Sequence, residues 1–211
     1  MLLIGDARQL GMELFPEGFV PDVLNLIIQT WVDFRLPANV RLEEPITALF
    51  RVALMDRYCA EGKDWFVTLE EPNIDPATGV EVSRTDLRFL PPGIKHTRRA
   101  FVLESKRLNI PSGSNASAYT GDEGMMRFVI RKYSPNHNCG GMVGYVMDGK
   151  VSKAHTTVVT SIRKCRQKLK MLPDGDFTAC RHTPNHPHTG ETRHRRDADE
   201  FVIYHLFLGV K

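Results

Sequence analysis

The residues best suited to chemistry are a carboxylate and an ammonium two positions apart, Glu104 and Lys106, which follow the apolar run Phe101-Val102-Leu103. An apolar run of this kind predicts a β-strand, and side chains alternate between the two faces of a strand. Val102, Glu104 and Lys106 are therefore expected on one face. Such a pair can hold a cation through its carboxylate and stabilise developing negative charge through its ammonium.

A second carboxylate, Asp86, lies in the preceding extended segment, residues 80–90. Pro91-Pro92-Gly93 separates this segment from residues 100–108, so the two segments are predicted to form an antiparallel hairpin. The hairpin would bring Asp86 to the face that carries Glu104. Two such carboxylates repel each other unless a cation lies between them, and Mg²⁺ suits an oxygen-rich site. With Lys106 to stabilise charge, these groups suit the hydrolysis of a phosphodiester.

Helices and strands around the hairpin follow from the apolar spacing. Residues 20–34 and a segment that begins at Glu43 have helical spacing, and residues 65–69 form a strand that ends before Pro72. A helix is expected over 119–133, a short strand over 140–146, and a basic amphipathic helix over 151–172. The chain then passes through a long loop over 181–196 and closes with a strand over 201–208.

This order, with D…ExK on a hairpin between helices, resembles the PD-(D/E)xK (restriction-endonuclease-like) nuclease superfamily. The matching residues are Asp86 within Thr85-Asp86-Leu87-Arg88-Phe89 and the triplet Glu104-Ser105-Lys106, and Thr85 stands where the family often has proline. The resemblance implies an α/β fold with an αβββαβ core and a mixed central sheet flanked by helices. It also implies dependence on Mg²⁺ or Mn²⁺, with Asp86, Glu104 and Lys106 as catalytic residues.

Many members of the superfamily add a metal-binding glutamate on the helix before the sheet. Glu43 fits that role better than Glu44, because it is in helical register with the apolar Ile46 and Phe50 and so faces inward. The metal ligands implied by the resemblance are therefore Glu43, Asp86 and Glu104.

The chain of 211 residues, 42% hydrophobic and 25% charged, is expected to form a single globular domain over 1–211. Its core would span 43–146, with helices in 1–40 and a basic helix and strand in 150–211. Neither a membrane span nor a signal peptide is predicted, which favours the cytoplasm. The four cysteines form no CxxC pair and are expected to be free thiols.

The net charge of +3 is a weak sign of a polyanionic partner, but the basic residues are clustered. Each cluster could equally be a solvated surface. The expected partner is nucleic acid, with DNA favoured over RNA, and a protein partner or a homo-oligomer stays open. The candidate nucleic-acid contacts are Arg88, Arg98, Arg99, Arg127, Arg163, Lys164, Lys168 and Lys170.

The main prediction is a metal-dependent nuclease, and the resemblance alone suggests a role in bacterial restriction or anti-phage defence. Two alternatives stay open on the same fold: a catalytically inactive subunit that binds nucleic acid, and a module that binds protein through residues 20–31. Tyr119 is a further candidate beside the site. A zinc site among Cys180 and the histidines of 182–194 is disfavoured by its spacing. His205 is expected to be a hydrogen-bonded core residue.

Overall fold

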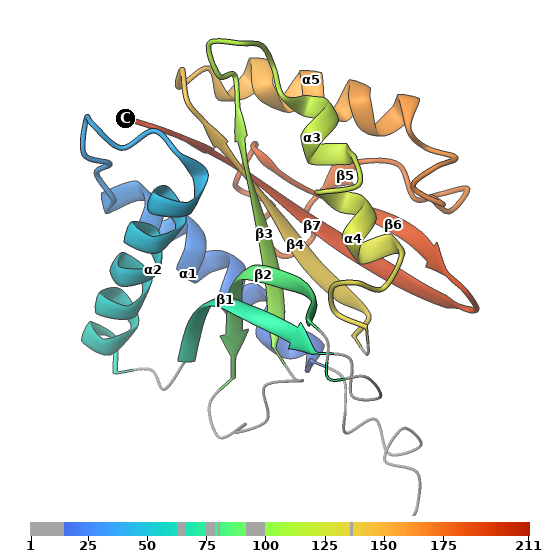
Figure 1. Ribbon diagram of the computed structural model, residues 1–211, viewed down its shortest axis with the longest axis horizontal. Coiled ribbons are helices and arrows are strands. Elements are labelled where there is room, and N and C mark those ends of the chain that lie inside the picture. The colour runs from blue at the N-terminus through green and yellow to red at the C-terminus, as the bar shows by residue number, and fades with distance from the viewer. Residues whose placement is uncertain (1–14, 63–65, 75–78, 80, 92–99, 136) are drawn as a thin grey trace, which may run out of the picture.

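A mixed β-sheet with helices on both faces organises the chain in the computed structural model (Figure 1). The structure describes residues 15–62, 66–74, 79, 81–91, 100–135 and 137–211. Within these residues the sheet has seven strands, and the fold is α/β, as the sequence predicts. No helix in the described ranges combines the length and the apolar character needed to cross a bilayer.

The strand order explains which connections must cross the sheet. In space the order is β1 (Phe66–Ile74), β2 (Glu81–Leu90), β3 (Phe101–Leu108), β4 (Cys139–Val146), β7 (Asp199–Gly209), β6 (Thr189–Arg196) and β5 (Thr178–Ala179). Strands β3, β4 and β7 are parallel to one another, and the remaining neighbours are antiparallel. Parallel neighbours require crossovers, which helices supply here.

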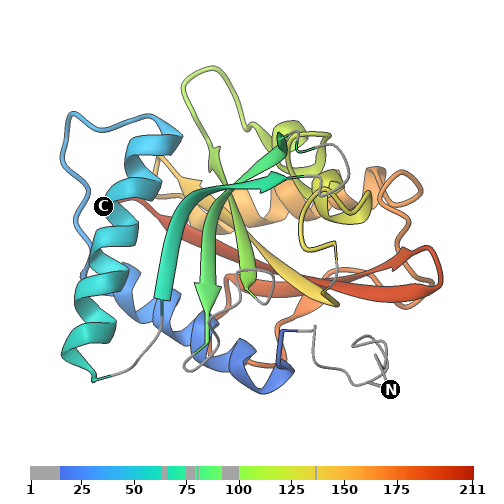
Figure 2. The ribbon, with the colours of Figure 1, turned by 60° about the horizontal axis from the view of Figure 1, so that its bottom comes forward.

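One face of the sheet is covered by α1 (Val20–Asp33) and α2 (Glu43–Ala60), with a 3₁₀ helix, η2 (Glu17–Phe19), ahead of α1 (Figure 2). Their apolar residues pack on Leu87, Phe101 and Leu103. The indole of Trp31 stacks on the ring of Tyr145, with ring centroids 5.3 Å apart. The helical spacing of residues 20–34 and of the segment from Glu43 therefore predicted both helices correctly.

The opposite face is covered by α3 (Ala116–Thr120), α4 (Met125–Val129) and α5 (Val151–Lys164). Val102 of β3 and Met142 of β4 belong to the apolar cluster beneath these helices. Glu104 and Lys106 lie two and four positions after Val102 along β3, so their side chains leave the strand on the same face.

Two predicted helices are wrong in extent. The segment 119–133 forms α4 and the end of α3 instead of one helix, since the chain breaks at Gly121 and Gly124. A Cβ at Gly124 would meet the carbonyl oxygen of Tyr119 at 2.2 Å, so a side chain has no room there. The basic helix ends at Lys164 instead of residue 172.

Two predictions in the sheet also need correction. Strand β1 continues through Pro72, which pairs with Arg84. Because β1 is an edge strand, the missing N–H of a proline is tolerated there. The segment 181–196 is not all loop, since Thr189–Arg196 pairs with β7 as strand β6. The charged residues of β6 concealed its strand character in the sequence. Of its two neighbouring strands, only β7 has an apolar run.

Candidate active site

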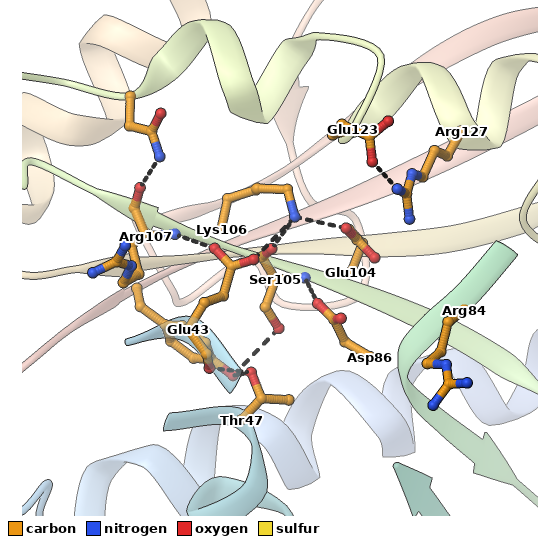
Figure 3. Close-up of polar contacts among 12 residues, drawn as sticks. Glu43, Thr47, Arg84, Asp86, Glu104, Ser105, Lys106, Arg107, Glu123 and Arg127 are labelled. Atoms are coloured by element: carbon orange, nitrogen blue, oxygen red, sulfur yellow. Dashed lines mark hydrogen bonds and ion pairs between the residues drawn. The ribbon is translucent and has the colours of Figure 1, made fainter. Parts of the chain in front are cut away.

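The site lies where β2 and β3 separate. Among the described residues the two strands pair at Leu87–Leu103, Arg88–Val102 and Phe89–Phe101, in the predicted antiparallel hairpin. Beyond Leu103, strand β3 continues alongside β4. From this point side-chain carboxylates, instead of the backbone of β2, accept the N–H groups of β3. Asp86 Oδ2 accepts the backbone N–H of Ser105 at 2.7 Å, and Glu43 Oε2 accepts that of Arg107 at 2.9 Å (Figure 3). The backbone of β3 thus positions both carboxylates.

Lys106 joins the acidic residues of the site. Its Nζ lies 2.7 Å from Glu104 Oε1, 3.1 Å from Glu43 Oε1 and 2.8 Å from the carbonyl oxygen of Ser105. Figure 3 shows the ammonium between the two glutamates. An ammonium has three N–H donors, and all three have an acceptor here. The residue is only 9% exposed, so this is a buried ion network rather than a surface pair.

One carboxylate oxygen of the site has no partner. Glu104 is 2% exposed, and its Oε2 accepts no hydrogen bond from the described residues, since the hydroxyl of the nearby Tyr133 gives its proton to the carbonyl oxygen of Arg84. Buried polar atoms are nearly always hydrogen-bonded, and an orphan of this kind costs about 1–3 kcal/mol, more if it is charged. An unsatisfied carboxylate oxygen is a candidate ligand for a hard cation such as Mg²⁺.

The electrostatics of the site reflect this shortage of positive charge. Burial, together with the nearby Asp86 carboxylate, raises the pKa of Glu104 to about 7. Burial likewise raises the pKa of Asp86 to about 6. Burial disfavours the ammonium of Lys106, but the carboxylates of Glu104 and Glu43 outweigh it and raise the pKa of Lys106 above its usual value.

Residues of α4 and the following loop border the site beyond Glu104. Arg127 forms an ion pair with Glu123, and its Nη1 donates to the hydroxyl of Tyr133. The Tyr133 hydroxyl in turn donates to the carbonyl oxygen of Arg84 at 2.5 Å, two residues before Asp86. Tyr133 therefore ties β2 to this loop at the point where β2 leaves β3. The sequence interpretation missed this role, because no local pattern links Tyr133 to Arg84.

The other predicted contacts are distributed over the molecule. Arg88 is buried, and its Nε donates to Thr85 Oγ1 at 2.9 Å. Arg98 and Arg99 lie outside the described residues. The remaining four are exposed, and Lys168 pairs with Asp122 at 2.9 Å. They lie on α5 and the turn after it: Arg163, Lys164, Lys168 and Lys170.

Tyr119 is fully buried, and its hydroxyl lies 2.9 Å from His205 Nδ1 and 3.4 Å from the carbonyl oxygen of Met142. His205 is the hydrogen-bonded core histidine that the sequence predicts. All four cysteines are free thiols, as expected. Burial raises the pKa of the Cys139 thiol to about 12, which disfavours a nucleophilic role.

In the part of the chain that the structure describes, no group of three or more His, Cys, Asp or Glu side chains is arranged to hold a metal ion. At the acidic site, the Lys106 ammonium occupies the space between Glu43 and Glu104. The donor set itself suits Mg²⁺ or Mn²⁺, since it consists of carboxylate oxygens and includes the unpartnered Oε2 of Glu104. Comparison of the chain with protein-family models, curated proteins and solved structures found no match.

Proposed function

We propose that this protein is a metal-dependent nuclease that hydrolyses phosphodiester bonds of nucleic acid, with DNA favoured over RNA. The observation that carries the proposal is the group formed by the half-buried Asp86 and the buried Glu104 and Lys106 at the separation of β2 and β3, joined by Glu43. A purely structural ion network would satisfy its buried charges, whereas Glu104 Oε2 has no partner among the described residues. That unsatisfied oxygen favours a binding site.

The topology supports a restriction-endonuclease-like core. The order α2, β1, β2, β3, α3 with α4, and β4 agrees with the αβββαβ arrangement that the resemblance implies. The pairing of β1 with β2 and of β2 with β3 is antiparallel, and that of β3 with β4 is parallel. Within this core the candidate residues come from the hairpin and from the first turn of α2.

The residues would divide the chemistry as follows. Glu43, Asp86 and Glu104 would hold Mg²⁺ or Mn²⁺, which supplies Lewis-acid polarisation of the phosphate when bound. The Ser105 N–H fixes the orientation of Asp86, and the Arg107 N–H fixes that of Glu43. Lys106 would donate from its ammonium to the phosphate oxygens and stabilise the charge that develops on them. A setting in bacterial restriction or anti-phage defence rests on the resemblance alone.

Nucleic acid would be held by positive charge outside the catalytic group. Arg163, Lys164, Lys168 and Lys170 are exposed and can reach phosphates, whereas the buried Arg88 would first have to leave Thr85. Contacts to phosphates release counterions, so binding through these four residues should weaken steeply with added salt. A variant with all four replaced by glutamine should show a flatter dependence of affinity on salt, and an unchanged slope would exclude this surface.

The decisive test is a cleavage assay on DNA and RNA with Mg²⁺ or Mn²⁺, with and without a chelator. Glu104→Gln and Lys106→Met should each lower the cleavage rate by on the order of 10²–10³-fold, because each removes a group that acts on the reacting phosphate. Glu44→Gln is the matched control, since Glu44 is the exposed neighbour of Glu43 and should cleave at the parental rate.

Three outcomes separate the alternatives. Cleavage that persists in excess chelator contradicts the metal-dependent mechanism. Salt-sensitive binding without cleavage under any metal condition favours the inactive nucleic-acid-binding subunit. Equal cleavage by the parent, Glu104→Gln and Lys106→Met reduces the group to an ion network without catalytic function.

A further inference from the structure

The position of Lys106 leads to an inference about how the site changes between its metal-free and metal-bound states. All three donors of the ammonium are already used by Glu43, Glu104 and the Ser105 carbonyl. A group that stabilises a substrate phosphate needs a donor directed at that phosphate. Lys106 in this arrangement has none to offer, so it must give up at least one partner before it can act.

The same contacts limit which oxygens a metal ion can use. Glu43 Oε2 is oriented by the N–H of Arg107, so Oε1 is the oxygen of that carboxylate without a backbone partner. Lys106 Nζ contacts this Oε1 at 3.1 Å and Glu104 Oε1 at 2.7 Å. The ammonium therefore occupies one oxygen of each glutamate, and a metal ion that bridged Glu43 Oε1 and the Glu104 carboxylate would have to displace it.

We propose that Lys106 is the resident cation of the metal-free site and competes with the divalent metal ion for the carboxylates of Glu43 and Glu104. This inference rests on the proposed function, because it concerns the same site. In the metal-free protein the ammonium offsets the repulsion among the buried carboxylate of Glu104 and the half-buried carboxylates of Glu43 and Asp86. A divalent ion replaces it there, and the released ammonium becomes free to contact the substrate. One side chain thus links the occupancy of the metal site to the availability of the catalytic cation.

The competition has a consequence that can be measured without any cleavage assay. Removal of the ammonium should strengthen metal binding, because the ion no longer has to displace a charge close to its ligands. By isothermal titration calorimetry, Lys106→Met should bind Mn²⁺ at least about tenfold more tightly than the parent. Lys106→Arg, which keeps the positive charge, should bind Mn²⁺ no more tightly than the parent. Lys153→Met, an exposed lysine on α5, controls for the loss of one positive charge and should match the parent.

Thermal unfolding gives a second readout on the same variants. In excess chelator Lys106→Met should unfold at a lower temperature than the parent, since its three carboxylates have lost their counter-ion. Saturating Mn²⁺ should then raise the unfolding temperature more in Lys106→Met than in the parent, because a ligand stabilises the folded state according to its affinity.

A measurement on the parent covers the case in which Lys106→Met does not fold. A buried ammonium with three acceptors exchanges its protons slowly, so Lys106 should give a side-chain ¹H–¹⁵N NMR signal, identified by its absence in Lys106→Arg. Saturating Mg²⁺ should shift or remove this signal. A signal that stays unchanged at saturation overturns the inference.

The results distinguish failure of this inference from failure of the proposed function. If the parent cleaves with Mn²⁺ but Lys106→Met binds Mn²⁺ within twofold of the parent, the competition is wrong and the nuclease proposal stands. If neither protein binds Mn²⁺ or Mg²⁺, both are overturned.

Discussion

Two polar networks in the interior of the molecule differ in how completely their groups are satisfied. The first is the acidic site of Glu43, Asp86, Glu104 and Lys106. The second, which we call the histidine chain, consists of Tyr119, His205, Thr192, His194 and the carbonyl group of Leu169. Both networks lie between the sheet and the helices that cover it. Burial alone does not indicate which of them is functional.

The histidine chain has one consistent order of protons. The carbonyl of Leu169 can only accept, so His194 Nδ1 donates to it at 2.8 Å, and His194 Nε2 then accepts from the hydroxyl of Thr192 at 2.7 Å. Thr192 Oγ1 accepts from His205 Nε2 at 2.9 Å, and His205 Nδ1 accepts from Tyr119 at 2.9 Å. Every ring nitrogen is used while both histidines stay neutral.

The acidic site shows the opposite condition. Burial lowers the pKa of His194 to about 4 and keeps its ring neutral, so the ring is compatible with its buried position. Burial also raises the pKa of Glu104 to about 7, but the hydrogen bonds of this carboxyl group remain incomplete. One oxygen of Glu104 has no partner in the described structure, although the side chain is buried. The histidine chain thus has the character of a structural network, in which every polar group has a partner. The acidic site leaves a buried carboxylate oxygen without a partner, a feature more typical of binding sites.

The largest expected effect comes from a break in the middle of the histidine chain. Thr192→Val removes the donor to His194 and the acceptor from His205, and leaves two ring nitrogens buried without partners. The free energy of unfolding should fall by about 2–4 kcal/mol in urea titrations. Thr156→Val is the control, because its hydroxyl is exposed on α5, and it should change stability by less than about 0.5 kcal/mol. Equal stability of the two variants would mean that the chain contributes nothing.

The dependence of stability on pH should separate the two networks next. The folded-state pKa of Glu104 lies above its usual value, so the folded protein binds the extra proton between pH 4.5 and about 7. This contribution to stability is present at the lower pH and is lost as the pH rises through that range. For His194 the folded-state pKa is lowered from 6.5 to about 4, so its contribution instead grows as the pH rises from about 4 to 6.5.

Glu104→Gln removes the falling contribution of Glu104, whereas the smaller falling contribution of Asp86, whose pKa is also raised, is present in both proteins. In chelator, the difference between the unfolding free energy of Glu104→Gln and that of the parent should therefore increase, in favour of the variant, by about 1–3 kcal/mol between pH 4.5 and pH 7.5. Urea titrations at several pH values measure this gap. If the unfolding free energies of the variant and the parent change in parallel with pH, burial does not disfavour the charged form of the Glu104 carboxyl group.

The smallest effect is expected from a matched pair of buried tyrosines. Tyr119 donates to His205 at 2.9 Å, whereas the hydroxyl of Tyr145 has only 3.3 Å contacts with Ser105 and Thr47 beneath the acidic site. Tyr119→Phe should cost about 1–2 kcal/mol of unfolding free energy, and Tyr145→Phe less than about 0.5 kcal/mol. A larger cost for Tyr145→Phe would show that the lower layer of the acidic site is held more tightly than its distances indicate.

Local patterns in the sequence determined the parts of the site. The alternation of side chains along residues 100–108 put Glu104 and Lys106 on one face, and the Pro91-Pro92-Gly93 turn indicated the hairpin that β2 and β3 form. The helical register of Glu43 with Ile46 and Phe50 directed its carboxylate inward, where it meets Lys106. These features depend on the period of a single element, so a window of a few residues is enough to predict them.

The tertiary structure decided how those parts meet. No local pattern indicated that β2 leaves β3 after Leu87 and Leu103, so that Asp86 accepts the N–H of Ser105 instead of lying within a continuous ladder. Nor did it indicate that Tyr133 ties β2 at Arg84, or that Lys106 lies between the two glutamates. Each of these features joins segments that are distant in the chain. Their contacts depend on the balance of packing, burial and charge in the folded molecule, which the spacing of residues within one segment does not encode.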